Sequence, residues 1–248
     1  MHARRLVRRN EAGFIGLAVT VGGIAGLGVA GLLGCADFLH LWLFGHRRLS
    51  SLVALDAPIQ AFVPLAGGLI LGISGIYVRK WIPRRPVDPI EANALQGGRM
   101  SLKDSALIAV QTVISNGFGA SVGLEAAYTQ VGSGIASWLG AAFRLRRGDM
   151  RMLVACGSAG AIGAAFGAPL TGAFYAYELI LGTYTPFGLA PVGAAAVSGV
   201  LVSKAFGASG EFMSQMPFKS ALSQTDMGFL LLLGIICALF WVRIMRAV

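Results

Sequence analysis

The chain has 248 residues, of which 56% are hydrophobic and 12% are charged, and its mean hydropathy is +0.72. Soluble domains usually carry about 25% charged residues, so this composition excludes an ordinary soluble domain and predicts an all-α integral membrane protein in a lipid bilayer. The formal net charge is +9. The basic residues flank the apolar segments, as topology signals do, so we expect no nucleic-acid partner.

Several segments are apolar and long enough, or nearly so, to cross a bilayer core, which takes about 20 residues per helix. In chain order they are 13–35, 58–78, 105–120, 122–143, 152–180, 187–206 and 227–247. A basic N-terminus, residues 1–12, precedes the first, and the positive-inside rule places it in the cytoplasm. Residues 32–35 resemble a lipoprotein cleavage box, but more apolar segments follow, so we expect residues 1–35 to be kept as a first helix.

Glycine and cysteine lie inside these apolar segments. Glycines four residues apart, such as Gly22 and Gly26, predict close packing of helix backbones in lipid. Cys35, Cys156 and Cys237 lie singly, without the spacing of metal ligands. We interpret them as buried small side chains, and we expect neither a metal site nor a cofactor.

Proline and glycine interrupt the apolar pattern after the second segment. Pro83, Pro86 and Pro89 follow that segment, and Asn116-Gly117 lies near the end of the next one. Irregular backbone at membrane depth persists only where protein buries it or where it lines an aqueous cavity. These interruptions predict broken and re-entrant helices around the binding site of a transported solute.

Glu125 follows the polar, glycine-rich stretch 115–123, at the start of an apolar helix. An ionised carboxylate at a helix centre costs about 2.5–3.5 kcal/mol on insertion scales, so Glu125 should face a cavity or a partner, or be neutral. Backbone N–H groups at a helix start attract anions, and a glutamate there can take the anion's place. Two interpretations stay open: a proton-sensitive gate, or an acid that only stabilises its own helix.

Glu178 is the second carboxylate that stands out within an apolar stretch. Pro169 suits the first turn of a helix, which would put Glu178 near the far end of that helix. A structural ion pair or an end cap is at least as good an interpretation as proton transfer, so both remain open.

The residues around these two glutamates resemble those of a known family. Gly123–Gln130 resembles the segment Gly-Arg/Lys-Glu-Gly-Pro, followed by a helix with a glutamine, of the CLC chloride channel family. About forty residues on, the stretch 157–178 resembles the next helix pair of that family, in the same order and spacing. The resemblance runs from about residue 13 to 206 and indicates a CLC-like first half-repeat.

The resemblance implies a subunit of two inverted halves, which forms a homodimer in a membrane, here expected to be a bacterial inner membrane. It also implies that chloride or a similar small anion binds where helix N-termini meet. Carried over by position, Glu125 would be the gating glutamate, which blocks or vacates the outer anion site. The backbone of Gly123, Leu124, Ala126 and Ala127 would line this site.

Two departures from the family pattern bear on the expected activity. Pro86, Val87 and Asp88 stand where the family has the anion-binding loop Gly-Ser-Gly-Ile-Pro. Pro86 lies near the serine position, where a proline goes with nitrate preference in some relatives. Exchangers of the family carry a proton-transferring glutamate at the place of Leu179. The resemblance therefore implies channel-like anion conduction, and the alternative is a proton-coupled anion exchanger with Glu178 on its proton path.

The sequence matches a single half-repeat. Residues 13–206 correspond to the first half, 207–226 would be a connecting loop, and 227–248 would be the first helix of an incomplete second half. A non-conducting fragment that needs a second half is therefore a further alternative.

An enzyme of the membrane is the remaining class. Ser209 lies in a Gly-Ala-Ser-Gly motif that resembles the nucleophile motif of rhomboid proteases. Such chemistry needs a histidine base, and the histidines all lie well before Ser209 in the chain. We interpret His40 and His46, near Trp42, as ordinary interfacial residues, and we do not expect an enzyme.

Overall fold

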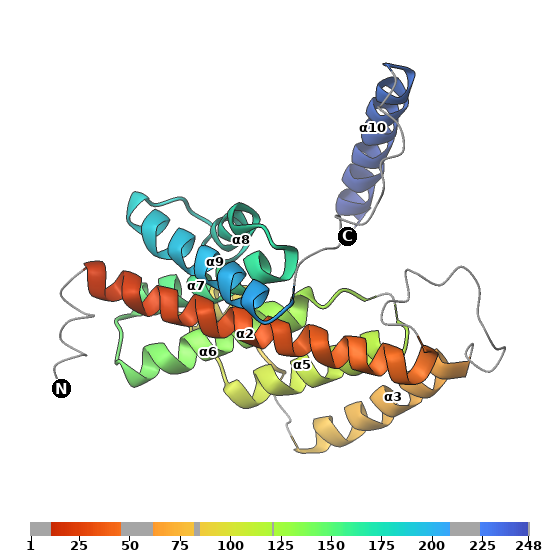
Figure 1. Cartoon of the computed structure of the whole chain (residues 1–248), viewed down its shortest axis with the longest axis horizontal. Coiled ribbons are helices and arrows are strands. Elements are labelled where there is room, and N and C mark those ends of the chain that lie inside the picture. The colour runs from red at the N-terminus through yellow and green to blue at the C-terminus, as the bar shows by residue number, and fades with distance from the viewer. Residues whose placement is uncertain (1–10, 46–61, 82–84, 121, 209–223, 248) are drawn as a thin grey trace. The chain divides into compact units, whose positions relative to one another are not determined.

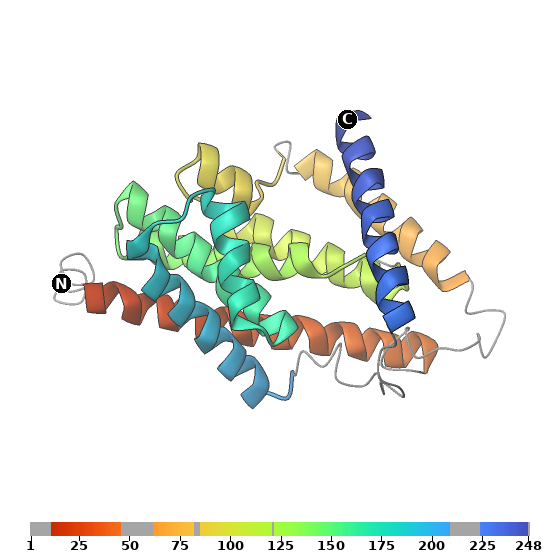
Figure 2. The ribbon, with the colours of Figure 1, turned by 90° about the horizontal axis from the view of Figure 1, so that it is seen from above.

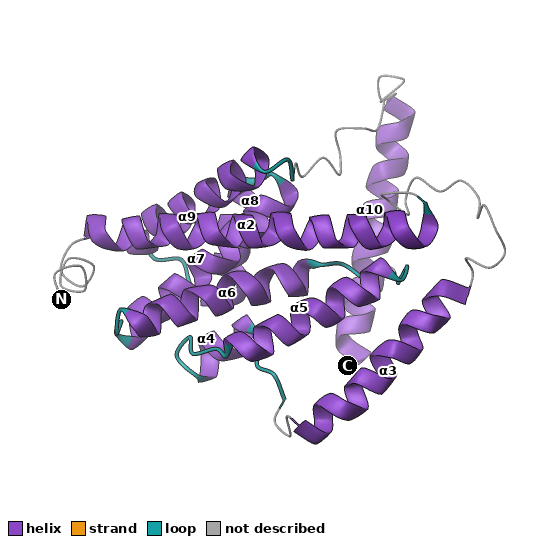
Figure 3. Ribbon diagram, turned by 60° about the horizontal axis from the view of Figure 1, so that its bottom comes forward, coloured by secondary structure: helices purple, strands orange, loops and turns teal. Residues whose placement is uncertain are grey.

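The structure is a computed structural model that describes residues 11–45, 62–81, 85–120, 122–208 and 224–247 (Figure 1). All regular elements in these ranges are helices, as Figure 3 shows, which confirms the predicted all-α class for the described part of the chain. The chain divides into two units, Met1–Glu211 and Phe212–Val248. The second unit contains α10 (Gln224–Ala247), at the place of the predicted segment 227–247.

The first unit carries the other described helices. They are α2 (Glu11–Phe44), α3 (Val63–Trp81), α4 (Pro89–Leu95), α5 (Leu102–Gly117), α6 (Glu125–Ala142), α7 (Arg147–Phe166), α8 (Pro169–Tyr175), the π-helical turn η3 (Ala176–Leu181) and α9 (Pro186–Ala205). The predicted segments coincide with them in order, with two differences. α2 continues past residue 35, because no glycine or proline follows before Gly45. The segment 152–180 is divided, because Gly167 ends α7 in the left-handed conformation (φ 64°) and Pro169 begins α8.

The helices differ in whether they could cross a bilayer. Among the described residues, α2 and α9 are long and apolar enough to span a membrane, judged by length and composition. α4 and α8 have seven residues each. At about 1.5 Å per residue these two are roughly 10 Å long, far short of a hydrocarbon core of about 30 Å.

Helices α2 and α9 lie side by side in the first unit (Figures 1 and 2). Gly22 and Gly26 lie at this contact, and a Cβ added to Gly26 would come within 2.9 Å of the Gly199 backbone. The Ser198 hydroxyl of α9 donates a hydrogen bond to the Val19 carbonyl of α2 at 2.9 Å. The two backbones therefore touch, which confirms the predicted packing role of this glycine pair.

Helix α7 forms the core of the first unit and contacts α2, α6, α8 and α9. Its residues 153–164 are all buried. Against α6 its Gly157 lies so close to Gly132 that a Cβ on either would overlap the other's backbone. The Ser133 and Ser158 hydroxyls meet at 2.6 Å in this contact. The core is thus built from small residues that bring backbones together.

The two cysteines whose side chains the structure describes differ in burial. Cys156 in α7 is buried, as predicted, whereas Cys35 in α2 is exposed, so the prediction was wrong for Cys35. The reason is helical phase, because Ala36 and His40, four residues apart, carry the buried face of α2 in this stretch. The side chain of Cys237 lies outside the described residues.

Residues 85–88 lead into α4 without regular structure. Asp88 caps this helix, since its Oδ1 accepts the Glu91 N–H at 2.7 Å and Pro89 occupies the first turn. The Asn93 amide donates to the Ile180 carbonyl at 2.6 Å and so joins α4 to η3. Pro83 lies outside the described residues.

Candidate functional site

The start of α6 offers backbone N–H groups. Leu124 is the N-cap residue, and among the described residues no side chain makes a capping hydrogen bond there. The first closed bond of the helix runs from the Tyr128 N–H to the Leu124 carbonyl at 2.9 Å. The N–H groups of residues 125–127 therefore have no partner within the helix, and together with the helix dipole they favour a negative charge.

Glu125 supplies such a charge from its own helix. Its carboxylate folds back over Gly123, and a Cβ added to Gly123 would overlap the carboxylate oxygens. The side chain of Glu125 and the backbone of Gly123 are both exposed on the first unit. Gly123 thus leaves room for the carboxylate in this position, and a larger residue there would make the Glu125 side chain move.

The glycine turn, which we define as residues 117–120 and 122–124, is folded onto the end of α5. Asn116 holds it twice: its carbonyl accepts the Gly119 N–H at 2.9 Å, and its side-chain amide donates to the Val122 carbonyl at 3.0 Å. Gly119 adopts a positive φ of 92°, which favours glycine. Residue 121 lies outside the described residues. Gly119 and Gly123 thus form a turn and a close approach, and not a helix-packing pair.

The segment before α4 lies against the same helix. The Gln130 amide of α6 donates to the Val87 carbonyl at 2.9 Å, and the Gln130 side chain is only 2% exposed. This bond joins positions 43 residues apart and brings Pro86, Val87 and Asp88 next to the first turns of α6. The structure therefore brings the two predicted groups of anion-binding residues together.

Tyr175, the last residue of α8, adds a side chain that the sequence analysis did not select. Its hydroxyl lies near the Thr129 hydroxyl, and it interacts electrostatically with the carboxylates of Asp88 and Glu125. Thr129 in turn donates to the backbone carbonyl of Glu125 at 2.9 Å. Tyr175 is thus within electrostatic range of Asp88, before α4, and of Glu125, at the start of α6. A tyrosine inside an otherwise apolar stretch was the signal that could have revealed it.

Glu178 lies elsewhere, in η3. Its Oε1 accepts a hydrogen bond from the Tyr184 hydroxyl at 2.9 Å, and Tyr184 stacks on Tyr177 with ring centroids 5.1 Å apart. The Glu178 carboxylate raises the pKa of Tyr184 through this bond. Leu179, at the place of the exchanger glutamate, is 47% exposed. Among the interactions of the described residues, none joins Glu178 to Glu125.

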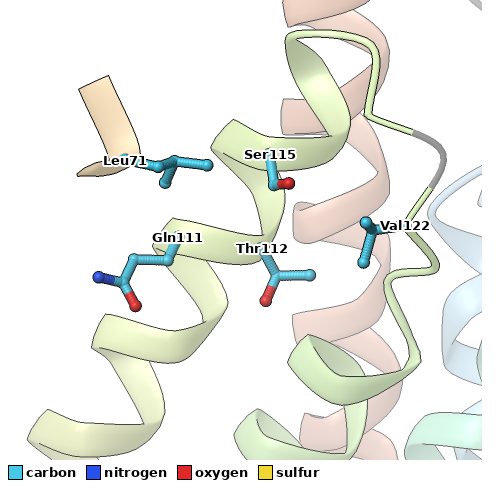
Figure 4. A pocket seen from close by; sticks show the side chains of 5 residues that line it. All are labelled: Leu71, Gln111, Thr112, Ser115 and Val122. Atoms are coloured by element: carbon cyan, nitrogen blue, oxygen red, sulfur yellow. The ribbon is translucent and has the colours of Figure 1, made fainter. Parts of the chain in front are cut away.

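An open cavity of about 320 Å³ lies beside the glycine turn (Figure 4). Leu71 of α3, Gln111, Thr112 and Ser115 of α5, and Val122 line it. Three of these five side chains are polar, and Val122 connects the cavity to the turn that leads to Glu125.

His40 has a structural partner that the sequence analysis did not identify. It is buried (8% exposed), and its Nε2 lies 2.9 Å from the Asn116 carbonyl, 76 residues away in the chain. Its place at the membrane interface stays a prediction. His46 and Ser209 lie outside the described residues. Within the described residues no group of three His, Cys, Asp or Glu side chains could hold a metal ion.

Comparison with known proteins gives the family. The family model of the voltage-gated chloride channels matches residues 67–247. A ClcB-like protein of Ralstonia nicotianae is 33% identical over 73% of this chain and 46% of its own length. The voltage-gated ClC-type chloride channel ClcB of Yersinia pseudotuberculosis is 28% identical over 69% of this chain and 46% of its own length.

The match extends further along the chain in another relative. The voltage-gated ClC-type chloride channel ClcB of Escherichia coli is 27% identical over 90% of this chain and 54% of its own length. The chain thus spans about half the length of the curated relatives it matches. Because the family model covers most of the chain, the protein belongs to the CLC family of voltage-gated chloride channels, which are membrane transport proteins and not enzymes.

Proposed function

We propose that this chain forms the first half of an anion pathway, in which Glu125 gates channel-like conduction of chloride or a similar small anion. The observation that carries the proposal is the Glu125 carboxylate folded over the start of α6, where no side chain caps the helix within the described residues. A carboxylate and a permeating anion would compete there for the same N–H groups.

The competition has a simple electrostatic basis. A helix start carries roughly half a positive charge, and this charge can be neutralised by the tethered carboxylate or by a free anion, but not by both at once. Protonation of Glu125 removes its charge and lets the anion bind. The N–H groups around Leu124, Ala126 and Ala127 would hold the anion, and Gly123 would leave it room.

Residues 86–88 would form the second wall of the site. Pro86 has no N–H and no hydroxyl, and the Val87 carbonyl is engaged by Gln130. The donors left to this wall are the N–H groups of Val87 and Asp88. With no hydroxyl in this wall, only backbone N–H groups are left to discriminate between anions of different shape. We therefore propose that the site accepts nitrate as well as chloride.

The surroundings of Glu178 favour a channel over a proton-coupled exchanger. Leu179 cannot transfer a proton, and the Glu178 carboxylate is already bonded to Tyr184. Exchange through Glu178 stays the alternative, because Glu178 is a carboxylate within an apolar stretch. A fragment that conducts only with a second half is the other alternative, since the chain spans about half of its relatives.

The proposed assembly follows from the same features. We place the chain in a bacterial inner membrane with its basic N-terminus in the cytoplasm, as a homodimer when complete. α4 and α8 are too short to cross a bilayer, which supports the interpretation that they enter it and end near the site as re-entrant helices.

Flux measurements in liposomes test the function. The chain, alone and together with a second half taken from a ClcB relative, should release chloride down its gradient, faster at low pH. Glu125→Gln should conduct at all pH values, and Glu91→Gln, an acid in the first turn of α4, is the matched control. Stoichiometric proton movement driven by a chloride gradient would replace the channel by the exchanger. No flux in any combination would refute the proposal.

A further inference from the structure

A chain of hydrogen bonds connects α2 to the glycine turn before Glu125. It begins at His40, whose Nε2 lies 2.9 Å from the carbonyl of Asn116 in the last turn of α5. It continues through the Asn116 side chain, whose amide donates to the Val122 carbonyl at 3.0 Å. Val122 directly precedes Gly123, against which the Glu125 carboxylate lies. Three separate elements are thus joined in one line.

The chemistry of the first bond fixes its direction. The Asn116 carbonyl can only accept, so His40 must donate through Nε2–H. The neutral Nε2–H tautomer and the imidazolium both carry this proton, so the bond does not depend on the charge of the ring. A carbonyl has two lone pairs, and this one accepts from the Gly119 N–H as well. Asn116 is therefore held between α2 on one side and the glycine turn on the other.

Packing around His40 leaves little freedom at this contact. The His40 ring meets Phe44 edge to face, with centroids 6.4 Å apart. Leu39, the residue directly before His40, packs against Gly117, where an added Cβ would come within 2.8 Å of the Leu39 Cβ. Because α2 and the end of α5 touch here, a shift of Asn116 would have to move both helices.

We propose that His40 is a positioning residue for the anion site: by holding Asn116, it fixes the glycine turn and thereby the N–H groups and the carboxylate at the start of α6. This inference rests on the proposed anion site. A pre-organised site binds more tightly, because the turn need not be ordered when the anion arrives. Among the hydrogen bonds and ring contacts described for His40, the one to Asn116 leads toward the anion site, so we expect its effect to pass through the turn.

Chloride titration of the whole 248-residue chain by calorimetry tests the binding part. One hydrogen bond contributes about 0.5–1.5 kcal/mol, so His40→Leu should weaken chloride binding about 3- to 10-fold. His40→Gln, whose amide can reach the same carbonyl, should restore most of the affinity. Ser198→Ala is the matched control, because it also removes a 2.9 Å bond between α2 and another helix, away from the glycine turn.

Hydrogen exchange tests the positioning without any anion. Amides of the glycine turn should exchange several-fold faster in His40→Leu, and at the original rate in His40→Gln and Ser198→Ala. Asn116→Ala is a second variant. It removes the hydrogen bond from the Asn116 side chain to the Val122 carbonyl and leaves His40 in place. It should reproduce both effects of His40→Leu, even if the latter folds poorly.

The outcomes separate this inference from the proposed function. If the unsubstituted chain binds chloride and Glu125→Gln alters that binding, but His40→Leu and Asn116→Ala change neither affinity nor exchange, the positioning role is refuted alone. Weaker binding in His40→Leu that His40→Gln does not restore also refutes it. If the unsubstituted chain binds no chloride, either alone or together with a second half taken from a ClcB relative, the proposed function fails, and this inference fails with it.

Discussion

The two glutamates within apolar stretches have different surroundings, although the sequence presents them alike. Glu125 lies in the first turn of α6, and its carboxylate folds back over Gly123, at a helix start whose N–H groups an anion could also use. Glu178 lies in the π-helical turn η3 and accepts a hydrogen bond from the Tyr184 phenol. A carboxylate that faces backbone donors can be displaced by another anion, whereas one that is held by a nearby phenol has a structural partner. The role of each glutamate thus depends on the hydrogen-bond donors that surround its carboxylate.

The largest expected effect comes from filling the space at Gly123. A methyl group in Gly123→Ala would occupy the place of the Glu125 carboxylate, and so of the proposed anion. Chloride affinity should fall about tenfold or more at every pH, because the methyl group takes the space that the proposed anion needs beside the N–H groups. Calorimetric titration measures this. Gly31→Ala, where an added Cβ meets open space, is the control. Undiminished chloride binding in Gly123→Ala would place the anion elsewhere.

A smaller loss is expected from the bond that joins the two walls of the site. Gln130→Leu leaves the partly buried Val87 carbonyl without the donor that Gln130 supplies, which should cost about 1 kcal/mol of stability or somewhat more. Thermal unfolding in detergent measures it. Gln111→Leu, which only changes the lining of the open cavity in Figure 4, should cost much less. Equal losses in the two variants would mean that the Gln130 bond does not hold the walls together.

A substitution beside Glu178 should leave chloride binding nearly unchanged. Tyr184→Phe removes the donor to an exposed carboxylate, so chloride affinity and its pH dependence should stay within twofold of the unsubstituted chain. The same calorimetric titration at two pH values checks this. A strong shift of the pH dependence in Tyr184→Phe would join Glu178 to the anion site and favour the exchanger.

The smallest effect concerns the Tyr184 phenol itself. Its pKa is raised from 10.0 by the hydrogen bond to Glu178, so the folded chain favours the neutral phenol. A raised pKa gives stability that is present below the unfolded value and lost as the pH rises through the folded value, hence above about pH 10. In an absorbance titration, Glu178→Gln should bring one tyrosine back toward lower pH. An unchanged titration would mean that the bond is absent in solution.

Much of the fold follows from local patterns in the sequence. Apolar length predicted the helices, and Gly167 and Pro169 mark the division between α7 and α8 because their backbone preferences act within a few residues. The close contact at Gly26 was also predictable, since small residues repeat on one face of α2. Burial was predicted wrongly where packing against distant helices decides which face of a helix is buried, as for the exposed Cys35.

The candidate site was predictable only in part. Glu125 could be selected because a glycine-rich stretch precedes it at a helix start, but its backward fold onto Gly123 depends on a rotamer. The contacts of Gln130 with Val87 and of His40 with Asn116 join residues 43 and 76 positions apart. Such bonds follow from how helices pack, and no local pattern encodes them.

The central claim is that the Glu125 carboxylate and an anion compete for the start of α6, and chloride affinity measured as a function of pH tests it most directly. In the unsubstituted chain, chloride affinity should fall as the pH rises, because the ionised Glu125 carboxylate takes the anion's place at the start of α6. In Glu125→Gln, chloride should bind tightly at every pH. A Glu125→Gln variant that keeps the pH dependence of the unsubstituted chain would contradict the account.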